Sequence, residues 1–180
     1  YDRVAIAFAD NPLIESVQVA PRVATSEIVV QTRLRNSGPA TSTELRQRVK
    51  PWKGGGPSFE SALLHLDMGL GESRLVTQTI PMPKARLWSP EDPFLYVLET
   101  ATKGDSSKTR FGLREFRSDA ATRRFHLNGK PYYLRGSNIT FHRFLEDPEC
   151  GALPWDEKWL RRLLVEIPHK MHWNSFRFCI

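Results

Sequence analysis

The chain has 180 residues, of which 40% are hydrophobic and 11% are aromatic, and it carries a formal net charge of +6. This composition is typical of a packed globular protein and argues against wholesale disorder. The basic residues are scattered among acidic ones, which disfavours a dedicated nucleic-acid surface, and no apolar run is long enough for a membrane span.

Short β-strands are predicted along most of the chain. Residues 1–10 (YDRVAIAFAD) predict one strand, and the opening at Tyr1 rather than Met, without a signal-peptide pattern, suggests a segment excised from a longer protein. Alternating apolar and polar residues, separated by turn residues, then predict strands over 15–21, 26–38, 43–52, 73–83, 94–104 and 107–116. Such spacing over ~100 residues favours an immunoglobulin-like β-sandwich, which we place at 11–117.

The pattern changes after Phe116. The stretches TRRFHL (122–127) and KPYYLRGSN (130–138) flank Asn128-Gly129, which is a strong signal for a two-residue hairpin turn. We expect an irregular loop over 139–154 and then a helix, with Asp156 as N-cap and Pro168 ending or kinking it. Its apolar face is predicted from the three-to-five-residue spacing of Trp155, Trp159, Leu160, Leu163, Leu164 and Ile167.

The last element, NSFRFCI (174–180), predicts a strand with Phe176 and Phe178 on one side and Arg177 and Cys179 on the other. A strand, a helix and a strand over ~45 residues form one βαβ unit, which requires parallel strands. Two parallel strands alone cannot bury both of their faces. The unit is therefore expected to open a larger α/β domain.

Four stretches together resemble a known family: LWSPEDPFLYVLET (87–100), FGLREF (111–116), FHLNGKPYYLRGSN (125–138) and WNSFRFCI (173–180). In this order and spacing they resemble glycoside hydrolase family 2, which includes β-galactosidases, β-glucuronidases and β-mannosidases. The resemblance implies three parts: 1–10 as the end of a jelly-roll domain, 11–117 as the immunoglobulin-like sandwich, and 118–180 as the start of a (β/α)8 (TIM) barrel. The fold class is thus mostly β, with the first βαβ unit of a barrel behind the sandwich, and the residues from Lys130 to Gly136 are expected to form the first barrel strand, packed by Tyr132, Tyr133 and Leu134.

The resemblance also implies roles for three residues. Arg177 matches an arginine that holds the nucleophilic carboxylate ionised, although a purely structural salt bridge is the alternative. Asn138 matches an asparagine that bonds a sugar hydroxyl or caps a loop, and His142 falls where relatives place a histidine near the sugar. The sequence ITFHRF around His142 departs from the family pattern, which argues against assigning galactosidase or glucuronidase specificity.

The activity implied is retaining exo-β-glycoside hydrolysis, which needs two carboxylates. The family's two glutamates lie on later barrel strands, so no catalytic carboxylate is assigned within the chain, which alone is expected to be inactive. The resemblance implies a carbohydrate partner and no organic cofactor, leaves a homo-oligomer open, and suggests a secreted or periplasmic home.

Several alternatives to a functional role stay open. His169 and His172 lack a third ligand, so a metal site is disfavoured, and Cys150 and Cys179 are interpreted as free thiols, with a disulfide as the alternative. The rival function is a non-catalytic carbohydrate-binding or structural β-sandwich module.

Overall fold

The structure is a computed structural model, and it describes residues 4, 6 and 8–179. The chain divides into two compact units. The sandwich unit comprises Tyr1–Phe116 and Leu127–Gly129, and the C-terminal unit comprises Arg117–His126 and Lys130–Ile180. None of the helices in the described part of the chain combines the length and hydropathy that a membrane span needs.

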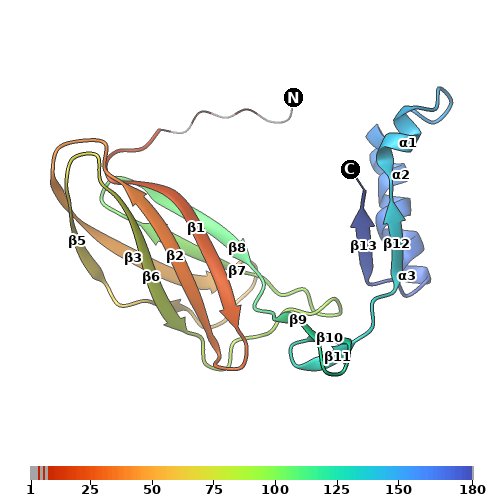
Figure 1. Cartoon of the computed structure of the whole chain (residues 1–180), viewed down its shortest axis with the longest axis horizontal. Coiled ribbons are helices and arrows are strands. Elements are labelled where there is room, and N and C mark those ends of the chain that lie inside the picture. Colours follow the sequence, from red (N-terminus) through yellow and green to blue (C-terminus); the bar gives the residue numbers. More distant parts are fainter. Residues whose placement is uncertain (1–3, 5, 7, 180) are drawn as a thin grey trace. The chain divides into compact units, whose positions relative to one another are not determined.

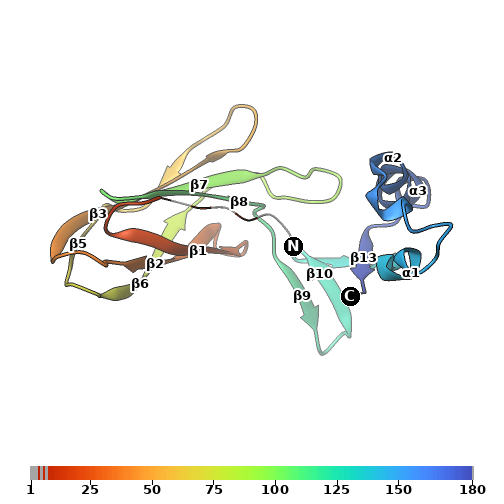
Figure 2. The same cartoon turned by 90° about the horizontal axis from the view of Figure 1, so that it is seen from above.

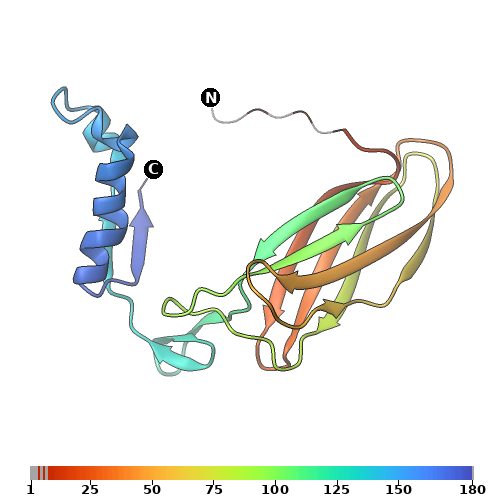
Figure 3. The ribbon, with the colours of Figure 1, turned by 180° about the vertical axis from the view of Figure 1, so that it is seen from behind.

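Two antiparallel sheets form the sandwich unit, and Figures 1 and 3 show them from opposite sides. The first sheet has the order β1-β2-β6 and contains β1 (Leu13–Arg22), β2 (Glu27–Arg35) and β6 (Ser73–Pro81). The second has the order β4-β3-β7-β8, with β5 also paired to β3, and contains β3 (Thr41–Pro51), β4 (Phe59–Glu60), β5 (Leu64–Met68), β7 (Tyr96–Ala101) and β8 (Ser106–Phe111). In Figure 2 the two layers are seen edge-on.

Strict alternation of side chains along the strands builds the core between these sheets. In β2, Ile28, Val30, Thr32 and Leu34 are fully buried, while Gln31 and Arg33 between them are exposed. The same period places Leu45 and Val49 of β3 inside. Because successive side chains of a strand point to opposite faces, the printed sequence alone identifies the inner set.

One buried polar contact joins the two layers. Gln47 Nε2 of β3 donates a hydrogen bond of 2.9 Å to Thr32 Oγ1 of β2, and both residues are buried. A buried polar group without a partner costs about 1–3 kcal/mol, so this bond offsets the burial of Gln47 Nε2 and Thr32 Oγ1, whereas Gln47 Oε1 is buried without a hydrogen-bond partner among the described residues.

The six strands predicted between 15 and 116 are confirmed, whereas β4 and β5 were missed. Strand β4 has only two residues, and the β5 sequence LHLDM lacks the β-branched residues that favour a strand. Of the strand predicted over 1–10, residues 1–3, 5 and 7 lie outside the described residues, and the remaining positions are not in a strand.

A small three-stranded sheet, ordered β11-β10-β9, follows the sandwich strands in sequence. It consists of β9 (Phe116–Asp119), β10 (Arg124–Leu127) and β11 (Lys130–Tyr132). The turn between β10 and β11 has positive φ at both central residues, 52° at Asn128 and 77° at Gly129. This confirms the two-residue hairpin, because asparagine and glycine are the residues that best tolerate positive φ.

The C-terminal unit contains a parallel strand pair with helices between its strands in sequence. Strand β12 (Gly136–Ile139) pairs with β13 (Ser175–Phe178), with Asn138 opposite Arg177 in the register. The connection holds α1 (Phe141–Leu145), the 3-10 turn η1 (Leu153–Trp155), α2 (Glu157–Arg161), the π-helical turn η2 (Arg162–Glu166) and α3 (Ile167–Lys170). The predicted parallel βαβ unit is therefore present.

The position of its first strand was predicted wrongly. Residues 130–132 belong to β11, in a different sheet from β13, and the strand that pairs with β13 begins only at Gly136. Within the described residues Tyr133 and Leu134 are 80% and 40% exposed, so the packing expected of them in a barrel stays a prediction. The ladder fails before Gly136 because Asn174 Nδ2 donates to the Tyr133 carbonyl, so a side chain rather than a strand neighbour satisfies that backbone group.

The helical connection also differs from the prediction in three places. The segment 139–154, predicted as loop, contains α1 and the start of η1. Trp155 precedes the N-cap and is 79% exposed, so it does not belong to the apolar face. Pro168 does not end the helix, which continues to Lys170, so of the two predicted alternatives only the ending is wrong. The helix is irregular directly before Pro168, where the π-helical turn η2 lies. The N-cap itself is confirmed, because the Asp156 side chain accepts hydrogen bonds from the backbone of Lys158 and Trp159.

Candidate functional site

The parallel pair β12–β13 presents one face to the helices and one that the described helices leave open. On the helix side, the Phe178 ring lies 6.0 Å from Phe141, which in turn lies 6.4 Å from Trp159 of α2. In Figures 1 and 3 the helices lie on the same side of the strand pair. Successive residues alternate, so Asn138 and Arg177 belong to the opposite face.

A hollow of about 520 Å³ lies over this strand pair. Its lining includes Gly136, Ser137 and Asn138 from β12 and Ser175, Phe176 and Arg177 from β13, together with Leu134. Neighbouring strands lie about 4.8 Å apart, so the register places Asn138 and Arg177 side by side on adjacent strands. The structure thus brings together two of the three residues singled out from the sequence.

Close backbone approach makes a glycine necessary at the start of β12. A Cβ atom at Gly136 would collide with the carbonyl oxygen of Ser175. The strand pair can therefore form at this register only with hydrogen at that position.

The Asn174 side chain binds the backbone directly before β12, and its role was not predicted from the sequence. Its side-chain oxygen accepts a 2.8 Å hydrogen bond from Arg135 N, and its Nδ2 donates a 2.9 Å bond to Tyr133 O. The hydroxyl of Ser175 adds a 3.2 Å bond to Arg135 O. These contacts fix where β12 meets β13, and hence the placement of Asn138 and Arg177. The signal that could have found Asn174 is its position directly before a strand, where an amide side chain can replace missing backbone partners.

The charge in the hollow is unbalanced. None of the described residues that line it is acidic, so the Arg177 guanidinium has no carboxylate beside it there. A guanidinium and an amide on one open face can donate several hydrogen bonds to a carboxylate or to sugar hydroxyls. The arrangement can bind and orient a polar ligand, whereas proton transfer or nucleophilic attack would need groups that the hollow does not hold.

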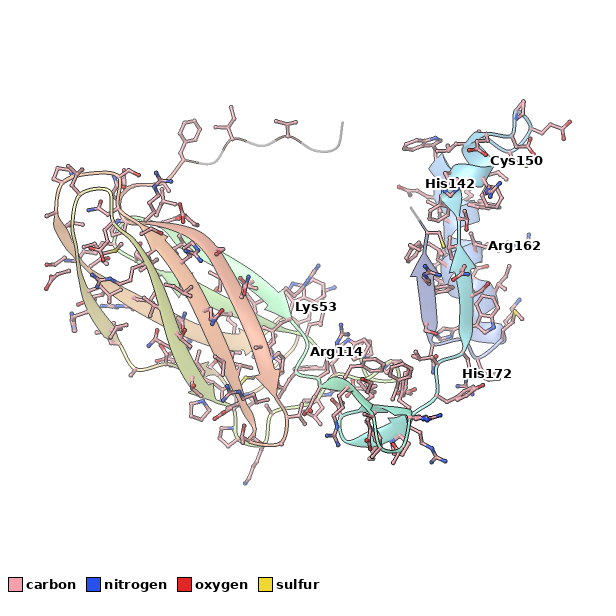
Figure 4. All side chains as sticks on the ribbon, viewed as in Figure 1. Lys53, Arg114, His142, Cys150, Arg162 and His172 are labelled. Carbon is pink, nitrogen blue, oxygen red and sulfur yellow. The ribbon has the colours of Figure 1, made fainter. Side chains whose placement is uncertain are left out.

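His142 is placed elsewhere. It lies in α1, is exposed, and does not line the hollow. Figure 4 labels its position. Within the described residues, no three His, Cys, Asp or Glu side chains come together in a way that could hold a metal ion. Cys150 and Cys179 are both free, which agrees with their interpretation as thiols.

Comparison with known proteins decides the family. The model of glycosyl hydrolases family 2 matches residues 13–114, more than half of the chain. The chain belongs to glycosyl hydrolases family 2. This confirms the resemblance seen in the sequence motifs.

Individual relatives agree with this assignment. β-Galactosidase 2 of Enterobacter cloacae is 34% identical over 117 residues, which are 62% of this chain and 10% of that protein. The chain thus spans about a tenth of the length of this curated relative.

Solved structures show the same fold. A family 2 glycosyl hydrolase from Bacteroides cellulosilyticus superimposes with a TM-score of 0.73 at 21% identity, over 93% of this chain and 23% of that one. A family 2 β-galacturonidase from Eisenbergiella tayi, bound to galacturonate, gives a TM-score of 0.67 at 20% identity, over 92% of this chain and 28% of that one. A fold covering nine-tenths of the chain includes both of its units.

Proposed function

We propose that the chain is part of a retaining exo-β-glycosidase that hydrolyses O-glycosidic bonds of carbohydrates. The single observation that supports this most is the parallel register of Asn138 and Arg177 on the open face of β12–β13, in a chain of glycosyl hydrolases family 2. The proposal divides the chain into the end of an upstream domain (1–10), an immunoglobulin-like sandwich (11–117) and the start of a (β/α)8 barrel (118–180).

The strand pair supports the barrel part of the proposal. In a barrel of this kind the helices lie outside and the opposite faces of the strands line the centre. Helices cover the Phe178 face of β13, so the Asn138 and Arg177 face corresponds to the inside. Among the described residues, β12 and β13 pair only with each other, and parallel strands with open edges require further strands beside them.

In the proposed mechanism the chain supplies supporting groups rather than the reacting ones. Arg177 would lie next to the nucleophilic glutamate, contributed from outside the chain, and its positive charge would lower the pKa of that carboxyl group. The nucleophile would then stay anionic and oriented for attack on the anomeric carbon. Asn138 would bond a hydroxyl of the sugar. His142, which lies in α1 outside the hollow, would contact the sugar from the segment after β12. The substrate is a β-linked sugar, with galactosides and uronides as the classes named for the relatives.

The test compares the 180-residue chain with the complete protein on a panel of chromogenic β-glycosides that includes galactosides, glucuronides and galacturonides. We expect turnover by the complete protein and none by the chain alone, because the two glutamates lie outside it. Turnover by the chain alone, or no turnover of any β-glycoside by the complete protein, would contradict the proposal.

A matched pair of variants in the complete protein tests the role of Arg177. Arg177→Ala should lower kcat by about 10²-fold or more, the range found when one preorganised electrostatic group is removed. Arg162→Ala is the control, since it removes the same charge from the exposed surface of the helical connection, where Figure 4 labels it. Equal effects of the two substitutions would remove Arg177 from the mechanism.

A further inference from the structure

The outer face of the second sandwich sheet carries two neighbouring cross-strand rows with different charge. In the first row, Arg48 of β3 lies opposite both Glu60 of β4 and Glu99 of β7, and Glu99 lies opposite Lys108 of β8. Arg48 Nε is 3.2 Å from Glu60 Oε1, and Lys108 Nζ is 3.7 Å from Glu99 Oε1. Opposite charges alternate along this row, so it is largely self-neutralised.

The second row has no acid. Lys50 of β3 lies opposite Val97 of β7, and Val97 lies opposite Arg110 of β8. Lys50 reaches back to the first row, with its Nζ 2.6 Å from Glu99 Oε1, while Arg110 lies over an aromatic ring instead of a carboxylate. The row therefore exposes two cations on either side of a small apolar residue.

That aromatic ring is Trp52, directly after β3. Its backbone N–H donates to Leu95 O at 2.9 Å, which fixes it at the end of the sheet, and 42% of the residue is exposed. The guanidinium carbon of Arg110 and the Nζ of Lys53 each lie 4.4 Å from the ring centroid. Lys53 is labelled in Figure 4. An exposed indole with two cations on it is an apolar surface within a positive field.

These residues surround a hollow of about 520 Å³, here called the Trp52 hollow, lined by Lys50, Trp52, Val97, Glu99, Lys108 and Arg110 along with Pro51. The hydrogen bond from Lys50, aided by the charges of Lys108 and Arg48 and opposed by burial, holds the pKa of Glu99 below its ordinary value. Glu99 is thus a fixed anion that two lysines already share, and Arg110 and Lys53 remain available to a ligand.

We propose that the Trp52 hollow binds an acidic polysaccharide, a chain of sugars that carry carboxylates. The carboxylates bind Lys53 and Arg110, and the apolar face of a sugar ring contacts the exposed part of Trp52. The choice of a carbohydrate among polyanions rests on the proposed function. Duplex DNA fits less well, because it carries about one negative charge per 1.7 Å, a denser line of charge than one carboxylate per sugar, and Glu60 and Glu99 of the adjacent row would repel it more strongly.

The test measures binding of polygalacturonate to the 180-residue chain by isothermal titration calorimetry. The double variant Lys53→Ala/Arg110→Ala should bind about tenfold more weakly, because two exposed charge contacts are each worth a few-fold in affinity. The matched control is Arg33→Ala/Arg35→Ala, which removes two exposed arginines from β2 in the other sheet and should leave the affinity within about twofold.

Further ligands and variants separate stacking from charge. Trp52→Ala should weaken binding of polygalacturonate by about tenfold and Trp52→Phe by less, because loss of one buried aromatic contact is worth ~1 kcal/mol or more, about tenfold per 1.4 kcal/mol. Neutral galactan should bind at least ~10-fold more weakly than polygalacturonate, since it cannot use the cations. Far-ultraviolet circular dichroism checks that each variant is folded.

Four results would overturn the inference: no binding of polygalacturonate, equal losses in the two double variants, equal affinity for neutral galactan, or tighter binding of duplex DNA or dextran sulfate at the same salt. The proposed function is judged separately by hydrolysis. If the complete protein turns over β-glycosides while polygalacturonate does not bind the chain, only the Trp52 hollow is refuted. If polygalacturonate binds and no β-glycoside is hydrolysed, only the glycosidase proposal is refuted.

Discussion

The Asn128 side chain should stabilise the sandwich unit through two hydrogen bonds and a tolerated backbone angle. Its Nδ2 donates to Trp88 O at 3.0 Å, and its Oδ1 accepts from Glu115 N at 3.0 Å. Alanine at this position would lose both bonds, at about 1 kcal/mol each, and would pay about 1 kcal/mol for a φ of 52°. Asn128→Ala should therefore lower the free energy of unfolding by about 3 kcal/mol.

Two further substitutions separate these contributions. Asn128→Gly loses the two bonds but tolerates positive φ, so its loss should be about 2 kcal/mol. Asn128→Asp keeps the acceptor and tolerates the angle, so its loss should be about 1 kcal/mol. Urea unfolding of the 180-residue chain, followed by far-ultraviolet circular dichroism, measures the series. The reasoning is refuted if Asn128→Ala is as stable as the wild type, or if the glycine variant is no more stable than the alanine variant.

Three more predictions concern other parts of the chain. Gly136→Ala should open the β12–β13 pair and speed the hydrogen exchange of its backbone amides. The control Gly55→Ala should leave this exchange unchanged, because nothing lies within 4 Å of the new Cβ. Unchanged exchange in both variants would refute the argument. Burial raises the pKa of Tyr96 above its ordinary value of 10.0, so the contribution of the neutral Tyr96 to the free energy of unfolding should be full below pH 10 and fall as the pH rises above 10. Tyr96→Phe should remove this alkaline loss of stability. The same substitution should cost about 1 kcal/mol at pH 7, because the Tyr96 hydroxyl accepts a hydrogen bond from the backbone N–H of Arg86. Hydrogen bonds from the backbone N–H of Gly69 and from Arg74 lower the pKa of Glu72, so Glu72 stabilises the fold above pH 4.5 and this stabilisation is lost as the pH falls through the lowered pKa. In Glu72→Gln the urea midpoint should therefore fall less steeply at acid pH. An unchanged acid dependence of the midpoint would contradict this prediction.

The sandwich could be predicted closely from the sequence because its strands are half buried. Residues such as Val30 and Leu34 alternate with Gln31 and Arg33, and a period of two is readable without any long-range information. Strand β5 has the same period, in Leu64, Leu66 and Met68, but its residues favour helix, so propensity and tertiary packing disagree there and packing decides.

The C-terminal unit was predicted less well because its strands are short and its contacts are long-range. The run KPYYLRGSN looks like one continuous strand, yet the side chain of Asn174, about forty residues later, binds the backbone at Tyr133 and Arg135 and delays the strand to Gly136. No local pattern contains that information. The parallel arrangement of the two strands was nevertheless predicted correctly, because a strand, a helix and a strand in sequence form a βαβ unit. The register that sets Asn138 opposite Arg177 was not predicted.

The most direct test is a crystal structure of the complete protein with a product sugar bound. Our account predicts that β12 and β13 are neighbours in a closed parallel barrel, that Asn138 lies about 3 Å from a sugar hydroxyl, and that Arg177 lies beside a glutamate carboxylate. A sugar bound away from these two residues, or a sheet in which β12 and β13 do not face a closed centre, would contradict it.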